Sequence, residues 1–198
     1  MLVWQQPHDM SMNAEFLERG SAGDGSDVAG VIVVGAPGSS PSPSTVVQSV
    51  GVNGNGKRWR IDILESAGHS PFKDVRCTDH FVCVGFGQHF YVIYLEEQRV
   101  ETMEVDGYFE DLYTPEDLES PSQAFSLLVA SASELISLSP TGSINWHTRE
   151  LGIDGVVAHR IQDGQIHGDG EWDPPGDWRP FTVDVETGAV ISIDHGGW

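Results

Sequence analysis

Short apolar runs rich in β-branched and aromatic residues, separated by turns that contain glycine, restrict the fold of this chain more than any other feature. The clearest pair, Thr45–Val52 and Arg58–Leu64, flanks the segment Asn53–Gly56, which reads Asn-Gly-Asn-Gly. Asn-Gly supplies the positive φ values that a tight hairpin turn requires. Polar and apolar residues alternate along Arg58–Ile63, which gives this strand one solvated face and one buried face. The sequence therefore predicts an antiparallel hairpin here.

The same pattern continues along the rest of the chain. Phe81–Phe86 and Phe90–Leu95 are expected to form a second hairpin across Gly87–His89. Further runs with strand character are Ser126–Ala130, Glu134–Leu138 and Thr182–Val185. A helical start is predicted at Thr114–Glu119, with Thr114 as N-cap and a proline at the first helical position. We expect an all-β protein with mainly antiparallel sheets.

The N-terminal part has a different composition. Residues 1–27 are polar and Gly-rich, and within them Asn13–Arg19 is a short helical candidate. A strand signal at Val31–Val34 is followed by Gly35–Ser44, a Pro/Ser/Gly-rich segment typical of linkers. We therefore expect a flexible N-terminal segment, residues 1–44, with one strand and the Pro/Ser linker, followed by an antiparallel β domain, residues 45–198.

An internal repeat is visible in the second half of the chain. Val82–Phe86 aligns with Leu127–Ser131, and each is followed by a second strand. The second copy runs on through Ser139–Trp146, and a third copy of that ending is Val183–Ile191. The period of about 45 residues is within the range of propeller blades. The repeating order is a strand, a polar turn with Thr-Gly, a second strand and a Trp. This order resembles the quinoprotein-type β-propeller repeat, over about residues 81–198.

The resemblance implies blade-like antiparallel sheets and no cofactor, because in that family these residues only shape the blades. It gives three copies, or four if residues 45–64 are counted, and four is the smallest number that closes a propeller. A closed propeller, an open row of blade-like sheets and a β-sandwich all remain open.

The charge balance excludes several classes of partner. Ten Lys and Arg against thirty Asp and Glu give a formal net charge of −20. Nucleic-acid binders need clustered basic residues, and anionic membrane surfaces repel a chain of this charge. We therefore expect no nucleic acid and no membrane as partner.

The cysteines and the apolar runs predict a cytoplasmic location. Cys77 and Cys83 are the only cysteines, and on one extended segment they would lie too far apart for a disulfide. Free thiols fit a reducing compartment. The first residues show no signal-peptide pattern, and the longest apolar run, Val28–Val34, is too short to span a bilayer.

The segment Glu96–Glu119 is the most distinctive part of the sequence. It holds ten Asp or Glu residues against one arginine, Arg99. Like charges this close repel, and a cationic partner would relieve the repulsion, with interleaved aromatic residues as anchors. The residues expected to bind this partner are Glu104, Asp106, Tyr108, Phe109, Glu110, Asp111 and Tyr113. The alternative is a solvated acidic loop whose aromatic side chains pack into the core.

A second acidic segment is a candidate metal site. His167, Asp169, Glu171 and Asp173 alternate with other residues, and oxygen ligands at every second position are typical of calcium loops. The EF-hand pattern itself is not present. The alternative is a polar strand edge that leads into the turn at Pro174–Asp177. Ca²⁺ is the one metal that this pattern suggests, and the sequence implies no other cofactor.

No catalytic motif stands out. The chain has no Gly-x-Ser-x-Gly elbow, no HExxH and no Cys/His pair at zinc spacing. Size, acidity and this lack of motifs are similar to those of bacterial toxin immunity proteins. The sequence thus favours a non-catalytic module that binds a basic protein, such as an immunity protein that neutralises a cationic toxin. The alternatives are a metal-dependent enzyme or calcium-stabilised β module that uses residues 167–173, and a repeat fragment that assembles with copies of itself.

Overall fold

The computed structural model describes residues 12–18, 28–37, 46–64, 72–119, 124–173 and 175–194. These residues form sixteen strands in four four-stranded sheets, and no helix occurs among them. The expected all-β class with blade-like, mainly antiparallel sheets is therefore confirmed.

The sheets follow one another in chain order. The first has the order β1-β3-β4-β2, with β2 parallel to β4 and all other pairs antiparallel. The other three are meanders in which each strand pairs with its sequence neighbour. The first sheet holds β1 (Asn13–Leu17), β2 (Gly30–Val34), β3 (Val46–Gly54) and β4 (Lys57–Leu64). The second holds β5 (Lys73–Cys77), β6 (Val82–Phe86), β7 (His89–Tyr94) and β8 (Arg99–Glu104). The third holds β9 (Phe109–Tyr113), β10 (Leu127–Ser131), β11 (Leu135–Leu138) and β12 (Ile144–Thr148). The fourth holds β13 (Val156–Gln162), β14 (Gln165–Glu171), β15 (Trp178–Asp184) and β16 (Val190–Ile193).

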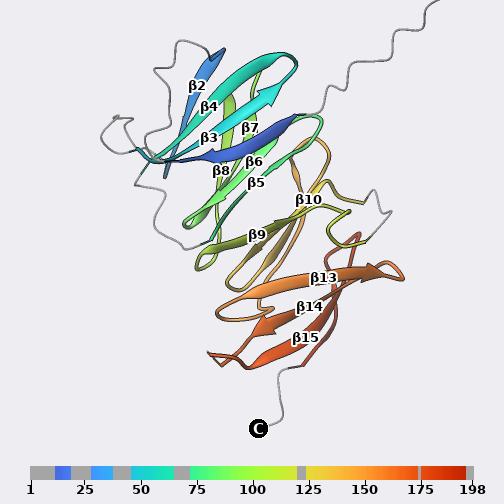
Figure 1. Cartoon of the computed structure of the whole chain (residues 1–198). Helices are drawn as coiled ribbons and strands as arrows, with labels where there is room; N and C mark the ends of the chain where they lie inside the picture. Colours follow the sequence, from blue (N-terminus) through green and yellow to red (C-terminus); the bar gives the residue numbers. More distant parts are fainter. Residues whose placement is uncertain are drawn as a thin grey trace, which may run out of the picture.

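The four sheets form an open row, with the first and the fourth at opposite ends of the molecule (Figure 1). Each of the three gaps between neighbouring sheets is filled by its own apolar cluster. Trp59 and Tyr91 belong to the cluster between the first and second sheets, and Phe90 and Phe109 to the next. Trp146 and Phe181 belong to the cluster between the third and fourth sheets.

This layering explains the strand patterns. The two middle sheets are covered on both faces, so every residue of β6, β7, β10 and β11 is buried, and their sequences are continuous apolar runs. The end sheets bury one face, so β14 alternates strictly between buried and half-buried positions. The apolar runs of these four strands therefore mark the middle of the row, whereas the apolar run of β2 lies in an end sheet and exposes Val31 and Val33.

Both predicted hairpins are present. Asn55 and Gly56, with φ of 53° and 71°, form the turn between β3 and β4, as a two-residue hairpin with positive φ at both positions requires. The second turn is tighter than expected, because His89 already belongs to β7 and only Gly87 and Gln88 form the turn.

Both helical predictions are wrong. Asn13–Leu17 is strand β1, since it pairs with β3 along its whole length. At Thr114 the expected capping bonds do form: its hydroxyl accepts from the Asp117 backbone N–H at 3.3 Å, and its own backbone N–H donates to Asp117 Oδ2 at 2.8 Å. However, residues 115–119 form only turns, and Glu119 adopts a left-handed φ of 52°, so no helix follows.

The expected domain boundary between residues 44 and 45 separates strands that belong to one sheet. β1 and β2 pair with β3 and β4, so the N-terminal strands share a sheet with the start of the expected β domain. Most of the Pro/Ser segment, residues 38–44, lies outside the described residues.

The two cysteines are free thiols. Cys77 packs with the cluster between the first and second sheets, and Cys83 with the cluster between the second and third. They thus lie on opposite faces of the second sheet. Within the described ranges, no helical segment has the length and apolarity to span a bilayer.

Candidate functional site

The first strands of three successive sheets, β5, β9 and β13, lie side by side. Their N-terminal ends lie close together along one side of the row. Phe72, just before β5, stacks on Tyr108, just before β9, with ring centroids 5.7 Å apart. The Tyr108 hydroxyl donates to the backbone oxygen of Asp154, just before β13, over 2.5 Å. These contacts tie three sheets together at one place.

Apolar side chains and carboxylates are mixed where these three strands begin. We call it the acidic–aromatic surface, and it consists of Phe72, Tyr108, Glu110, Ile153, Asp154, Glu171 and Trp178. Three of its large apolar side chains are well exposed: Phe72 at 41%, Ile153 at 55% and Trp178 at 41%. Exposed apolar residues next to charged ones are typical of protein-binding surfaces.

Glu110 lies at the centre of the surface, partly buried between the third and fourth sheets. Its Oε2 accepts a hydrogen bond from the backbone N–H of Val156 at 2.7 Å. Burial first, and then the carboxylates of Asp111, Glu171 and Asp154, raise the pKa of Glu110 to about 7 against the opposing effect of the Val156 N–H. Burial, with the neighbouring carboxylates as a smaller cause, therefore favours the protonated form of the Glu110 carboxyl here.

Trp178 and Glu171 come from the fourth sheet, where they are paired neighbours on β15 and β14. A Cβ on Gly155 would lie 2.8 Å from the Trp178 ring and 3.3 Å from Glu110 Oε1. The Trp178 indole and the Glu110 carboxylate thus both lie against Gly155, where the absence of a side chain leaves room for them. Glu171 Oε1 accepts from the Gly176 N–H at 2.5 Å, which holds the loop beside it.

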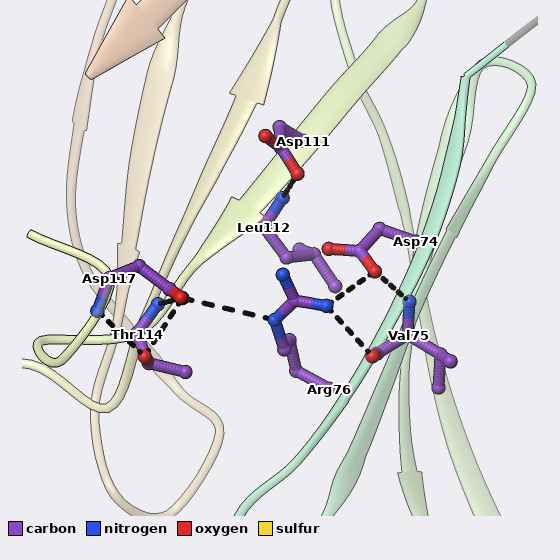
Figure 2. A network of polar contacts seen from close by, with 7 residues as sticks. All are labelled: Asp74, Val75, Arg76, Asp111, Leu112, Thr114 and Asp117. Carbon is purple, nitrogen blue, oxygen red and sulfur yellow. Dashed lines mark hydrogen bonds and ion pairs between the residues drawn. The ribbon is translucent and has the colours of Figure 1, made fainter. Parts of the chain in front are cut away.

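A polar network lies between β5 and β9, next to this surface (Figure 2). Asp74 Oδ1 accepts from Arg76 Nη1 at 2.6 Å and from the Val75 N–H at 2.7 Å. Its Oδ2 is buried and has no hydrogen-bond partner in the described part of the chain. Burial first, and then Asp111 across the seam, raise the pKa of Asp74 to about 6, while Arg76 and the Val75 N–H oppose the shift. Arg76 Nε also lies 3.9 Å from Asp117 Oδ2, so one arginine faces two carboxylates.

The predicted partner-binding residues are not all on one surface. Phe109 is fully buried and Tyr113 is 9% exposed, so both belong to the core. Glu104 is exposed at the end of β8, the edge strand on the far side of the second sheet. Tyr108 and Glu110 are on the acidic–aromatic surface, and Asp111 is beside it in the network with Asp74.

The acidic segment is also partly neutralised. One group of its carboxylates lies on β8 and the turn before it. Another group lies on β9 and the turn after it. Lys57 Nζ pairs with Glu96 at 2.6 Å, and Arg99 pairs with Glu97 and Glu101. Residues 96–119 therefore form two separate acidic areas.

The four predicted metal ligands do not converge. Asp169 Oδ2 lies 2.7 Å from His159 Nε2, Glu171 binds the Gly176 N–H, and Asp173 is exposed beyond the end of β14. Among the described residues, no three His, Cys, Asp or Glu side chains are arranged to hold a metal ion. His167, Asp169 and Glu171 instead lie at the half-buried positions of β14, an inner strand that pairs with β13 on one side and β15 on the other.

One buried carboxylate has a structural role that the sequence did not reveal. Glu134 is 1% exposed, and its Oε1 accepts from the Asp106 N–H at 2.9 Å. Its Oε2 lies 2.6 Å from His147 Nε2 and 3.6 Å from Arg149 Nε. Glu134 thus fixes the β8–β9 connection that leads into Tyr108.

The sequence reasoning also missed Phe72, Ile153 and Asp154. Each stands alone in its local sequence, and only the adjacency of β5, β9 and β13 brings them together. No family model and no curated protein sequence matches this chain.

Proposed function

We propose that this chain is a non-catalytic protein-binding module that recognises a basic protein through the acidic–aromatic surface. In its most specific form, it is an inhibitor of the immunity-protein kind, which neutralises a cationic toxin. The observation that supports the proposal is the meeting of exposed Phe72, Ile153 and Trp178 with Glu110, Asp154 and Glu171 at the ends of three sheets.

The two kinds of side chain have different tasks in such an interface. Large apolar groups at the centre of an interface supply most of the binding free energy once they are desolvated. Carboxylates around them select a basic partner and speed its approach, helped by the net charge of −20. Arg and Lys side chains of the partner would also stack on Trp178 and Phe72.

The test is affinity capture at low salt from the organism that encodes the chain, followed by binding kinetics with the captured protein. Ile153→Ala and Trp178→Ala should speed dissociation, and Asp154→Asn should slow association. Ile144→Ala is the matched control, because Ile144 is 47% exposed on the edge strand β12. Capture of a protein that is not basic, or equal kinetics for Ile153→Ala and Ile144→Ala, would contradict the proposal.

A further inference from the structure

The hairpin between β3 and β4 contains the only two Asn-Gly pairs of the chain, Asn53–Gly54 and Asn55–Gly56. In an Asn-Gly pair the asparagine amide lies next to a backbone nitrogen that the following residue, which has no side chain, does not shield. Both pairs therefore hold the groups for the same intramolecular reaction. The fold decides which of them can react.

Asn53 and Gly54 are held in the first sheet. They are the last two residues of β3, where Asn53 pairs with Arg58 of β4 on one side and with Asn13 of β1 on the other. The Asn53 side-chain amide donates to Asn13 Oδ1 at 3.3 Å. A Cβ on Gly54 would lie 2.6 Å from Met12 Cγ, so the backbone is also covered there. The Asn53 amide carbon and the Gly54 nitrogen can therefore react only when this end of the sheet opens.

Asn55 and Gly56 form the tip of the same hairpin, outside the strands. Both residues are exposed, and a Cβ on Gly56 would meet no atom within 4 Å apart from those of its chain neighbours. Within the described ranges, neither the Asn55 side-chain amide nor the Gly56 N–H makes a hydrogen bond. The attack requires a rotation of the Asn55 backbone, and at an open loop tip this local motion costs little free energy.

We propose that Asn55 is a site of spontaneous deamidation, with water as the co-reactant, and that the sheet protects Asn53 from the same reaction. The Gly56 nitrogen attacks Cγ of Asn55 and forms an N–Cγ bond. The amide nitrogen leaves as ammonia and takes up the proton that the Gly56 nitrogen loses. Water then opens the resulting succinimide ring at one of its two carbonyl groups. Opening at Cγ gives aspartate, and opening at the backbone carbonyl carbon gives isoaspartate.

The two products have different effects on the first sheet. Aspartate at position 55 keeps the turn, because Asp-Gly adopts the same positive φ values as Asn-Gly. Isoaspartate adds a methylene group to the backbone of a two-residue turn, so the closing pair of Gly54 and Lys57 no longer fits the register of the hairpin. Isoaspartate should therefore destabilise β3 and β4, with which β1 and β2 pair.

The test is mass spectrometry of the full chain after incubation at pH 8, both folded and unfolded in urea. Trypsin releases one peptide, residues 20–57, that contains both Asn-Gly pairs, and electron-transfer fragmentation locates aspartate and isoaspartate within it. In the folded chain we expect conversion at Asn55 to be at least about tenfold faster than at Asn53, whereas in urea the two rates should be equal. Equal rates in the folded chain, or conversion in urea alone, would overturn the proposal.

Variants separate the reaction from its effect on the sheet. Asn55→Gln should remove the fast phase of ammonia release, and the matched control Asn53→Gln should keep it; a fast phase that persists in Asn55→Gln would refute the site. Asn55→Asp represents the aspartate product and should melt with the parent. The fraction of the incubated chain that carries isoaspartate at position 55 should melt at a lower temperature, and equal melting of this fraction and Asn55→Asp would refute the effect on the first sheet.

Discussion

Replacing Glu110 by glutamine should stabilise the protein at high pH. The folded chain holds the Glu110 carboxyl among Asp111, Asp154 and Glu171, partly out of water, and this raises its pKa from 4.5 to about 7. Between these two values the folded chain binds a proton that the unfolded chain has released. The group therefore stabilises the fold fully below about pH 4.5, and this contribution is lost as the pH rises through about 7.

The size of the effect follows from the two pKa values. At about 1.4 kcal/mol per pH unit, the difference between 4.5 and about 7 sets an upper bound of about 3 kcal/mol. Glu110 is only partly buried, so solvent screening reduces the expected gain at pH 8 to about 1–2 kcal/mol. Glutamine keeps an oxygen that can accept the Val156 N–H, so the hydrogen bond at this seam is retained.

Urea unfolding followed by tryptophan fluorescence at pH 5, 6, 7 and 8 measures the difference. The free energy of unfolding of Glu110→Gln relative to the parent should rise between about pH 4.5 and about pH 7 and level off above that. Glu116→Gln, at an exposed carboxylate, should show no such divergence. If Glu110→Gln is no more stable than the parent at pH 8, the raised pKa of Glu110 from burial and neighbouring carboxylates is refuted.

Two further substitutions test the packing and the buried polar contacts. Gly85→Ala should lower the free energy of unfolding by about 1–3 kcal/mol, because a Cβ there would lie 2.0 Å from the Phe109 ring. A second change, Phe109→Leu, should recover part of this lost stability in thermal unfolding. An unchanged melting temperature for Gly85→Ala alone would show that the contact is looser. Glu134→Ala leaves the Asp106 N–H and His147 without their buried acceptor and should cost about 1–3 kcal/mol; a urea midpoint equal to that of the parent would contradict this role.

Local chemistry made the two hairpins predictable, whereas the full set of strands in each sheet was not predictable. The turn at Asn55 and Gly56 needs positive φ, and the sequence supplies the residues that adopt it. β1 was not predicted, because its pairing with β3 bridges a long stretch of chain and five residues have no decisive pattern of their own. β5 carries the charged residues Lys73, Asp74 and Arg76, and β13 carries His159 and Arg160, and these side chains hid the strand character of both segments.

The candidate site was predictable only in part. Tyr108 and Glu110 stood out because they lie in an acidic segment of the sequence. Their neighbours Asp154 and Trp178 come from another sheet, and only the placement of that sheet brings them there. The pattern could not show that Phe109 and Tyr113 face the core, since an aromatic residue among carboxylates fits both a binding surface and a strand with one buried face.

The open row of sheets makes this molecule nearly one-dimensional. Each sheet depends on its immediate neighbours, as repeats do in a solenoid, so the total stability is close to a sum of nearest-neighbour terms. Melting of a terminal sheet uncovers one apolar gap, whereas melting of an internal sheet uncovers two. Fraying should therefore begin at the two ends of the row, and β6, β7, β10 and β11 should hold together longest.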